Sequence, residues 1–132
     1  MRISRRLLDE LIAHARANAP NECCGMIAAR DGAAVAVHRA TNAAASPLRY
    51  EIEGREQYRI QTAIEDAGLD LGAIYHSHTR SAPEPSQTDI NLAFYPDALY
   101  VIVGVSDEEA DVRAWTIVDG KVSGAALEVE ES

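Results

Sequence analysis

The segment from residue 76 to residue 89 holds the residues of this chain best suited to chemistry. His76 and His78 are separated by one residue, and Asp89 follows after ten intervening residues. Two imidazoles and one carboxylate are ligands that a catalytic zinc ion uses when its fourth position holds water. A structural zinc site would more often have four ligands rich in thiolate. The spacing therefore suggests an open metal site, and with it a hydrolytic reaction.

Each of these three residues also has an explanation that needs no metal. His76 and His78 could be ordinary polar residues at a strand edge, since histidine is common in both roles. Residues 86–89 (Ser-Gln-Thr-Asp) match a helix N-cap with an acidic residue at the third helical position. The two interpretations of Asp89 are compatible, because a capped first turn would hold its carboxylate in a fixed direction.

Glu22, Cys23 and Cys24 stand directly before an apolar stretch. Glu22 would be the general base if it faced the metal site, but taken alone it is interpreted as a surface carboxylate or a paired one. A cysteine nucleophile with one of the two histidines as its base would instead give a cysteine hydrolase. Alternation along a strand sends the two thiols to opposite faces, and Glu22 would oppose thiolate formation. We therefore favour two structural cysteines.

The elements that position these residues follow from periodicity and turn residues. Apolar residues at helical spacing, together with capping residues, predict helices over about 4–18, 54–67 and 86–95. Runs bounded by turn residues predict strands over about 22–30, 33–39, 48–52, 71–78, 99–105, 111–118 and 122–129. His76 and His78 then project from one face, where a buried strand ends. A few helices flanking a mixed, mostly antiparallel sheet indicate an α+β or three-layer α/β fold.

Four further residues of these predicted elements have structural interpretations. His14 and His38 have no ligand partner nearby in the sequence and are expected at the surface. Phe94 and Trp115 lie among apolar residues and are expected in the core. None of the four is therefore assigned to the site.

Composition and charge exclude several classes of function. The chain has 132 residues, 47% of them hydrophobic, and a formal net charge of −9. It is long enough for one domain, residues 1–132, and binding to nucleic acid or to an anionic membrane is not expected. Charged residues and glycines interrupt every apolar stretch, so no membrane span is predicted. Adjacent cysteines rarely bridge each other, which favours the cytoplasm.

Three separated segments together resemble a known family. Glu22 lies in a Pro-x-Glu-x-Cys-Gly context, His-Ser-His follows at 76–78, and Ser86 and Asp89 come next at fixed spacing. This pattern is similar to that of the JAMM (Mov34/MPN/PAD-1) metallopeptidases, over residues 1 to about 118. The resemblance implies the cytidine-deaminase-like MPN fold and one Zn²⁺ per chain, held by His76, His78 and Asp89. It also implies Glu22 as general base and Ser86 as support for the oxyanion.

Within this family, the segments 75–79, 85–89 and 117–120 resemble the Mec-type bacterial enzymes. Those enzymes release cysteine from a small ubiquitin-like sulfur-carrier protein, CysO, in cysteine biosynthesis. The resemblance implies such a carrier, with a Gly-Gly tail, as partner, and Arg80 is a candidate for binding a substrate carboxylate. An isopeptidase acting on lysine conjugates, a non-catalytic MPN scaffold and an amidase for a small metabolite are alternatives. A homodimer is left open.

Overall fold

Eight strands and three helices make up residues 1–131, the part of the chain that the computed structural model describes. The strands are β1 (Arg2–Ser4), β2 (Cys24–Arg30), β3 (Ala33–Ala40), β4 (Asp70–His78), β5 (Leu99–Gly104), β6 (Asp111–Val118), β7 (Lys121–Ala125) and β8 (Glu128–Glu130). The helices are α1 (Arg5–Asn18), α2 (Gly54–Asp66) and α3 (Gln87–Asn91). The strands form one sheet in the order β7-β6-β5-β4-β2-β3-β1-β8.

The sheet is mixed, and most of its pairings are antiparallel. Strand β4 lies antiparallel to β2 and parallel to β5 near the centre of the sheet. Strand β1 pairs in parallel with β3 and β8, whereas β2–β3, β5–β6 and β6–β7 are antiparallel. This arrangement confirms the predicted fold class.

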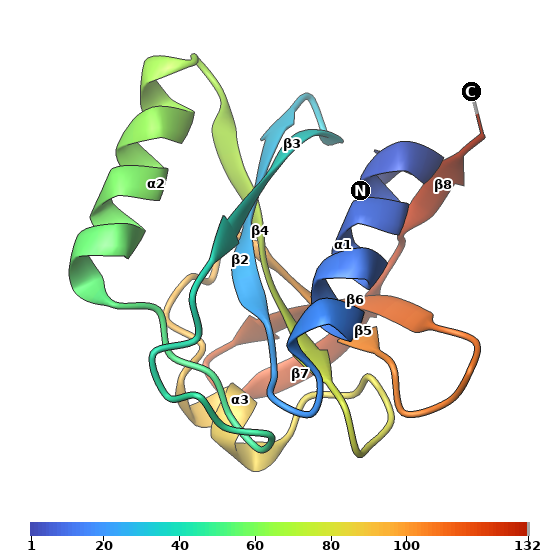
Figure 1. The fold of residues 1–132 in the computed structure, drawn as a ribbon. Helices are drawn as coiled ribbons and strands as arrows, with labels where there is room; N and C mark the ends of the chain where they lie inside the picture. The colour runs from blue at the N-terminus through green and yellow to red at the C-terminus, as the bar shows by residue number, and fades with distance from the viewer. Residues whose placement is uncertain (132) are drawn as a thin grey trace.

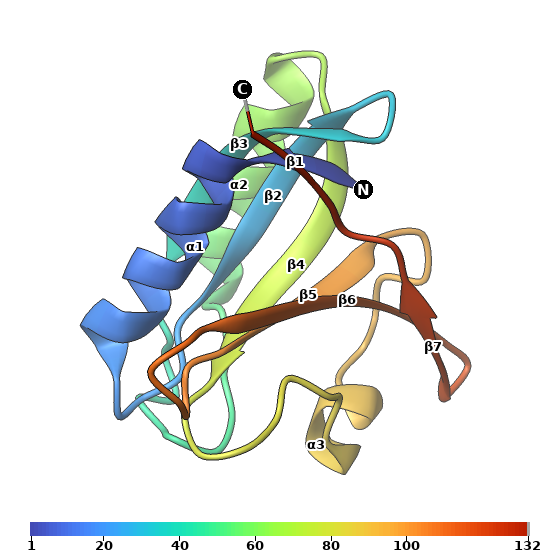
Figure 2. The same cartoon turned by 90° about the vertical axis from the view of Figure 1, so that its right-hand side faces the viewer.

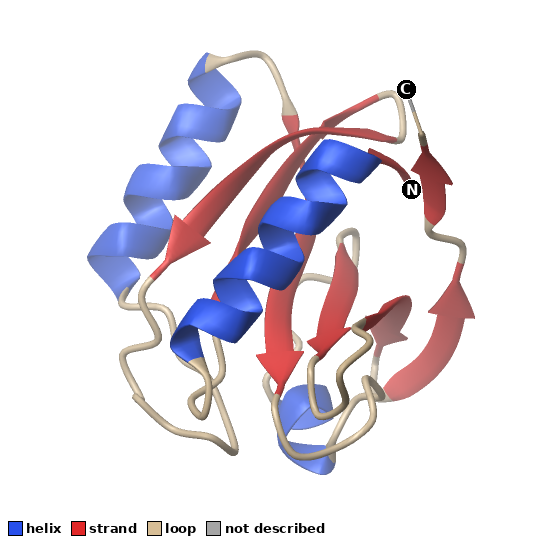
Figure 3. Ribbon diagram, turned by 45° about the vertical axis from the view of Figure 1, so that its right-hand side comes forward, coloured by secondary structure: helices blue, strands red, loops and turns tan. Residues whose placement is uncertain are grey.

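Helices α1 and α2 cover opposite faces of the sheet (Figures 1 and 3). Residues of β2 alternate between the two faces, so that Ile27 packs in the cluster under α1 and Met26 in the cluster under α2. Helix α3 is short and lies below the sheet in Figure 2, at the end toward which β4 runs. Among the described residues, no helix has both the length and the apolar character needed to cross a membrane.

Local sequence signals account for several boundaries. The Ser4 hydroxyl accepts a hydrogen bond of 3.2 Å from the Leu7 amide and caps α1. The φ angles are positive at two Asp-Gly pairs: 51° and 79° at Asp31 and Gly32, and 51° and 77° at Asp119 and Gly120. Two residues in the left-handed region make the tight turn that joins adjacent antiparallel strands.

Three element predictions were wrong in whole or in part, and one strand was missed. Residues 48–52 form no strand, because the Asn42 side chain binds backbone groups of Arg49 and Glu51. The third helix ends at Asn91 and not near Tyr95, whose amide donates to the Tyr100 hydroxyl. The last strand is divided into β7 and β8. Strand β1 was missed because three residues are too few for a periodic pattern, and distant strands hold them.

His14 is buried, so its predicted place at the surface was wrong. It is 5% exposed, and its Nδ1 lies 2.7 Å from the Tyr75 hydroxyl. The Tyr75 ring in turn packs on Gly25, where an added Cβ would lie 2.5 Å from the ring. Burial, and the nearby charge of Arg39 to a smaller extent, lower the pKa of His14 to about 4.

This buried imidazole predicts a loss of stability in acid. Between its unfolded pKa of about 6.5 and its folded pKa of about 4, the unfolded chain binds a proton that the folded chain does not. The free energy of unfolding therefore decreases as the pH is lowered across this range, by about 3 kcal/mol from this group. We expect His14→Gln, which keeps a partner for the Tyr75 hydroxyl, to remove that part of the slope in denaturant unfolding. Parallel pH curves for the two proteins would contradict the assignment.

Candidate metal centre

The two histidines lie at the end of β4, on the face of the sheet that α2 covers. His76 and His78 are 1% and 4% exposed, and the intervening Ser77 points to the other face, where its hydroxyl accepts from the Cys23 amide. Asp89, 6% exposed, reaches the same place from α3. The alternation predicted from the sequence thus brings both imidazoles to one side, and the loop 79–86 returns the chain to supply the carboxylate.

The ligand atoms of these residues converge on one point. His76 Nε2 lies 3.2 Å from His78 Nε2 and 3.2 Å from Asp89 Oδ2, and His78 Nε2 lies 3.0 Å from the same oxygen. In a tetrahedral site with bonds of about 2.0–2.1 Å, two ligand atoms are about 3.3 Å apart. The donor set therefore fits one small divalent ion, and three protein ligands leave one position for water.

Hydrogen bonds outside this triad fix its orientation. His78 Nδ1 lies 2.8 Å from the Ala82 carbonyl, which assigns the proton to Nδ1 and leaves the Nε2 lone pair for a metal. Asp89 Oδ2 accepts from the Ser86 amide at 2.9 Å, while the Ser86 hydroxyl accepts from the Asp89 amide at 3.1 Å. This capping box holds the carboxylate, so the cap and the ligand interpretation of Asp89 are compatible, as expected. The His76 ring stacks on Tyr50 with centroids 4.5 Å apart.

The charges of the triad suit a cation. Burial alone would raise the pKa of Asp89, but hydrogen bonds from His76 and His78 hold it well below its usual range. Burial lowers the pKa of His76. For His78, burial opposes protonation, yet the hydrogen bonds to Asp89 and Ala82 outweigh it and raise the pKa. Metal ligation requires an anionic carboxylate and neutral imidazoles, so a cation that binds here would displace a proton from His78.

Glu22 lies beside the triad and is buried, so its interpretation as a surface carboxylate was wrong. Cys24 pairs with His76 in the β2–β4 register, and continuing this register by two residues places Glu22 opposite His78. The Glu22 side chain is 3% exposed and its Oε1 has no hydrogen-bond partner within the protein. Burial raises the pKa of Glu22 to about 8, against a smaller lowering effect of His78. A buried carboxylate oxygen without a partner calls for a ligand or a catalytic role.

The other residues that the sequence indicated for the site differ in their exposure to solvent. Ser86 is exposed at the start of α3, and its hydroxyl oxygen already accepts the Asp89 amide, which leaves its proton to donate. Arg80 is exposed, two residues beyond β4. Cys23 and Cys24 are 1% and 0% exposed and belong to opposite core clusters, as predicted. Burial raises the pKa of the Cys23 thiol to about 11 and that of Cys24 to about 12.

Comparison with known proteins decides the family. Residues 4–118 match the family described as "Prokaryotic homologs of the JAB domain". The chain belongs to this JAB-domain family. The resemblance to JAMM metallopeptidases that the sequence pattern indicated is thereby confirmed.

Curated relatives of this JAB-domain chain include a peptidase and a desampylase. It is 39% identical over 128 residues to a CysO-cysteine peptidase of Mycobacterium tuberculosis, covering 95% of this chain and 88% of that one. It is 38% identical over 115 residues to a desampylase of Haloferax volcanii, covering 82% of each. A solution structure of a Desulfitobacterium hafniense protein superposes with a TM-score of 0.90 at 26% identity, covering 99% of this chain and 93% of that one. With the geometry of the triad, these relatives confirm the predicted class of enzyme, a metallopeptidase.

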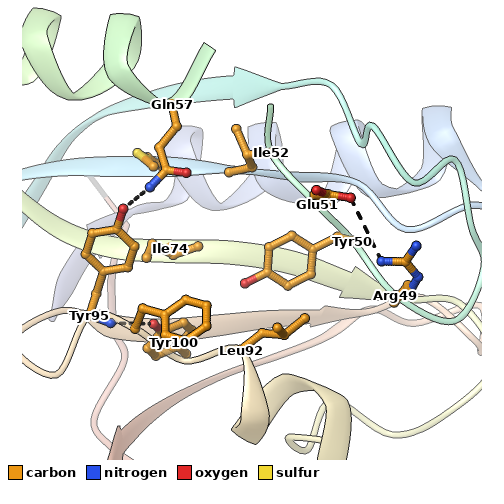
Figure 4. Close-up of a pocket in the computed structure, with 11 residues that line it drawn as sticks. Arg49, Tyr50, Glu51, Ile52, Gln57, Ile74, Leu92, Tyr95 and Tyr100 are labelled. Atoms are coloured by element: carbon orange, nitrogen blue, oxygen red, sulfur yellow. Dashed lines mark hydrogen bonds and ion pairs between the residues drawn. The ribbon is translucent and has the colours of Figure 1, made fainter. Parts of the chain in front are cut away.

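Sequence reasoning missed a cavity that adjoins the JAB-domain site. Its volume is about 330 Å³, and Figure 4 shows the Tyr50 ring extending into it. The other lining residues come from α2, the segment 49–52, the sheet and the chain after α3: Met26, Arg49, Glu51, Ile52, Gln57, Ile74, Leu92, Phe94, Tyr95 and Tyr100. Phe94 is 72% exposed beside this cavity, and Trp115 is only half-buried. The prediction that both lie in the core was therefore wrong. A single sequence carries no periodic signal for such a cavity, because irregular segments form much of its wall.

Proposed function

We propose that this JAB-domain protein is a zinc peptidase that cleaves the C-terminal amide bond of a ubiquitin-like sulfur-carrier conjugate and releases cysteine. The observation that carries the proposal is the convergence of His76, His78 and Asp89, with the buried Glu22 opposite His78. The similarity to a CysO-cysteine peptidase over 95% of this chain supports the substrate class.

The chain supplies each part that amide hydrolysis needs. A bound zinc ion would act as a Lewis acid and lower the pKa of water toward neutrality. Glu22 would take a proton from the attacking water and give it to the leaving amine. The Ser86 hydroxyl would donate a hydrogen bond to the carbonyl oxygen as negative charge develops there.

The cavity gives the carrier tail a path to the site. Tyr50 lines the cavity on one side and stacks on His76, so a chain that occupies the cavity passes close to the metal ligands. An extended Gly-Gly tail fits a narrow approach, because glycine has no side chain to obstruct it. The exposed Arg80 remains our candidate for binding a substrate carboxylate, which the released cysteine would provide.

A lysine isopeptidase is the second candidate, and the similarity to a desampylase favours it. The two functions share their chemistry and differ in the leaving group. We expect carrier–cysteine to be cleaved at least about tenfold faster than carrier–lysine conjugates when both compete for the zinc-loaded protein. The products are resolved by mass spectrometry of the intact carrier. Faster cleavage of the lysine conjugate would make the isopeptidase the main activity.

Thiol chemistry is the third possibility, and both cysteines are buried with raised pKa values. We expect Cys23→Ala and Cys24→Ala to retain hydrolysis within about threefold of the wild type. Alanine is chosen because serine would bury a hydroxyl in an apolar cluster. The measurement is the steady-state rate of carrier–cysteine cleavage, with circular dichroism as a control for folding. A large loss of activity in a folded variant would restore the cysteine hydrolase.

The cellular setting follows from the same proposal. We place the reaction in the cytoplasm, where free thiols such as Cys23 and Cys24 stay reduced. The partner is a small protein, and the net charge of −9 disfavours nucleic acid. A homodimer stays a prediction.

A further inference from the structure

An irregular segment, residues 41–53, holds the backbone of Glu22, and we call it the strap. The Glu22 amide donates to the Ser46 carbonyl at 2.9 Å, and the Glu22 carbonyl accepts from Asn42 Nδ2 at 3.0 Å. The next residue, Cys23, is held instead by Ser77 of β4, through contacts of 2.8 Å and 3.1 Å. Glu22 is therefore positioned by the strap and not by the sheet ladder.

Asn42 is the residue that organises the strap. Its Nδ2 donates to the carbonyls of Glu22 and Arg49, both at 3.0 Å, and its Oδ1 accepts from the amides of Ala44 and Glu51, both at 3.0 Å. These four bonds use both donors and both acceptor positions of the amide group. One side chain thus joins both limbs of the strap to the backbone of Glu22.

The Glu22 carboxylate has little else to hold it. Its Oε1 has no hydrogen-bond partner within the protein, so its direction depends on the backbone to which it is attached. Proton transfer needs donor and acceptor within about 2.6–3.2 Å, and a misplacement of about 1 Å can cost about 100-fold in rate. The strap also carries Tyr50, which stacks on His76. The same strap therefore contacts the candidate base and one candidate ligand.

We propose that Asn42 is a positioning residue that fixes Glu22 for proton transfer. The effect of Asn42 on turnover rests on the function proposed above. Its effect on the position of the Glu22 backbone does not depend on that function. The four hydrogen bonds of the Asn42 side chain go to backbone groups and not to the three ligand side chains, so its loss should leave the metal in place. This combination separates a positioning role from a purely structural one.

The test uses two variants and one control in the zinc-loaded protein. Asn42→Ala removes all four bonds, whereas Asn42→Asp keeps the two acceptor bonds that shape the strap and loses both donors. Asn18→Ala is the control, because its exposed side chain donates only to the His14 carbonyl within α1 and makes no bond to the strap. We expect both Asn42 variants to lower kcat for carrier–cysteine by about 10–100-fold, with KM within about threefold and one zinc per chain. The control should stay within about twofold of the wild type.

Amide hydrogen exchange gives a measurement that is independent of activity. The Glu22 amide should exchange at least about tenfold faster in both Asn42 variants, while the Met26 amide in β2 should keep its wild-type rate. Unchanged exchange at Glu22, or an unchanged kcat in Asn42→Asp, would overturn the proposal. A loss of activity that only parallels loss of zinc would do the same. If the wild type cleaves no carrier conjugate, the proposed function fails, and exchange at Glu22 still decides the role of Asn42.

Discussion

Glu22→Gln is expected to retain zinc and to lose turnover by about 10²–10⁴-fold, the contribution typical of a positioned general base. Glutamine keeps the size and shape of the side chain but cannot accept the proton of the attacking water. The triad should stay intact, since hydrogen bonds join His76, His78 and Asp89 to one another and Glu22 Oε1 has no hydrogen-bond partner. Burial already favours the neutral form of Glu22, so a neutral replacement should fold normally. The measurements are kcat for carrier–cysteine and zinc content by elemental mass spectrometry.

Glu65→Gln is the matched control for Glu22→Gln. Glu65 is an exposed carboxylate of α2 and does not line the cavity, so its variant removes one negative charge away from the site. It should keep wild-type turnover. A Glu22→Gln enzyme as active as this control would remove Glu22 from the mechanism. Loss of zinc together with activity would instead give Glu22 a role in metal binding.

His78→Ala is expected to abolish stable zinc binding and, with it, detectable turnover. The substitution removes an Nε2 that lies 3.2 Å from His76 Nε2 and 3.0 Å from Asp89 Oδ2. It also removes the contact that ties the site to the Ala82 carbonyl. Losing a group that only supports a ligand costs about 10–100-fold in metal affinity, so losing a ligand itself should cost more. Zinc content after dialysis against a chelator measures the effect.

His38→Ala is the control for His78→Ala. His38 lies in β3, pairs with Met26 in the β2–β3 register and belongs to no cluster of possible metal ligands among the described residues. Its variant should keep one zinc per chain under the same dialysis. Normal zinc content in His78→Ala would show that His78 is no ligand, and the candidate metal centre would have to be reassigned.

Local signals in the sequence predicted the strand and the short helix that carry the three candidate ligands. The alternation that brings His76 and His78 to one face is a property of any strand, and Ser86 caps the short helix that directs Asp89. Burial was harder to predict, because it depends on what the rest of the chain places over a residue. Taken alone, Glu22 was interpreted as a surface or paired carboxylate, whereas its side chain is 3% exposed and the strap binds its backbone.

The errors elsewhere have the same physical origin. His14 follows Leu7 and Leu11 at helical spacing, so its place on the buried face of α1 was present in the pattern. It was placed at the surface instead, because no ligand partner lies near it in the sequence. Part of the strap, residues 48–52, was predicted as a strand, since apolar and charged side chains alternate along it. The hydrogen bonds of the Asn42 side chain to the backbone of Arg49 and Glu51 exclude strand pairing there. Contacts between segments distant in sequence are what a single sequence does not display.

Zinc titration of the metal-free protein tests the central claim most directly. The chelator-stripped protein is mixed with increasing zinc, and release of cysteine from the carrier conjugate is followed at each ratio. We predict no turnover without metal and a linear rise that saturates at one zinc per chain, as one triad of ligands requires. Full activity in the stripped protein, or activity that never depends on zinc, would contradict the account.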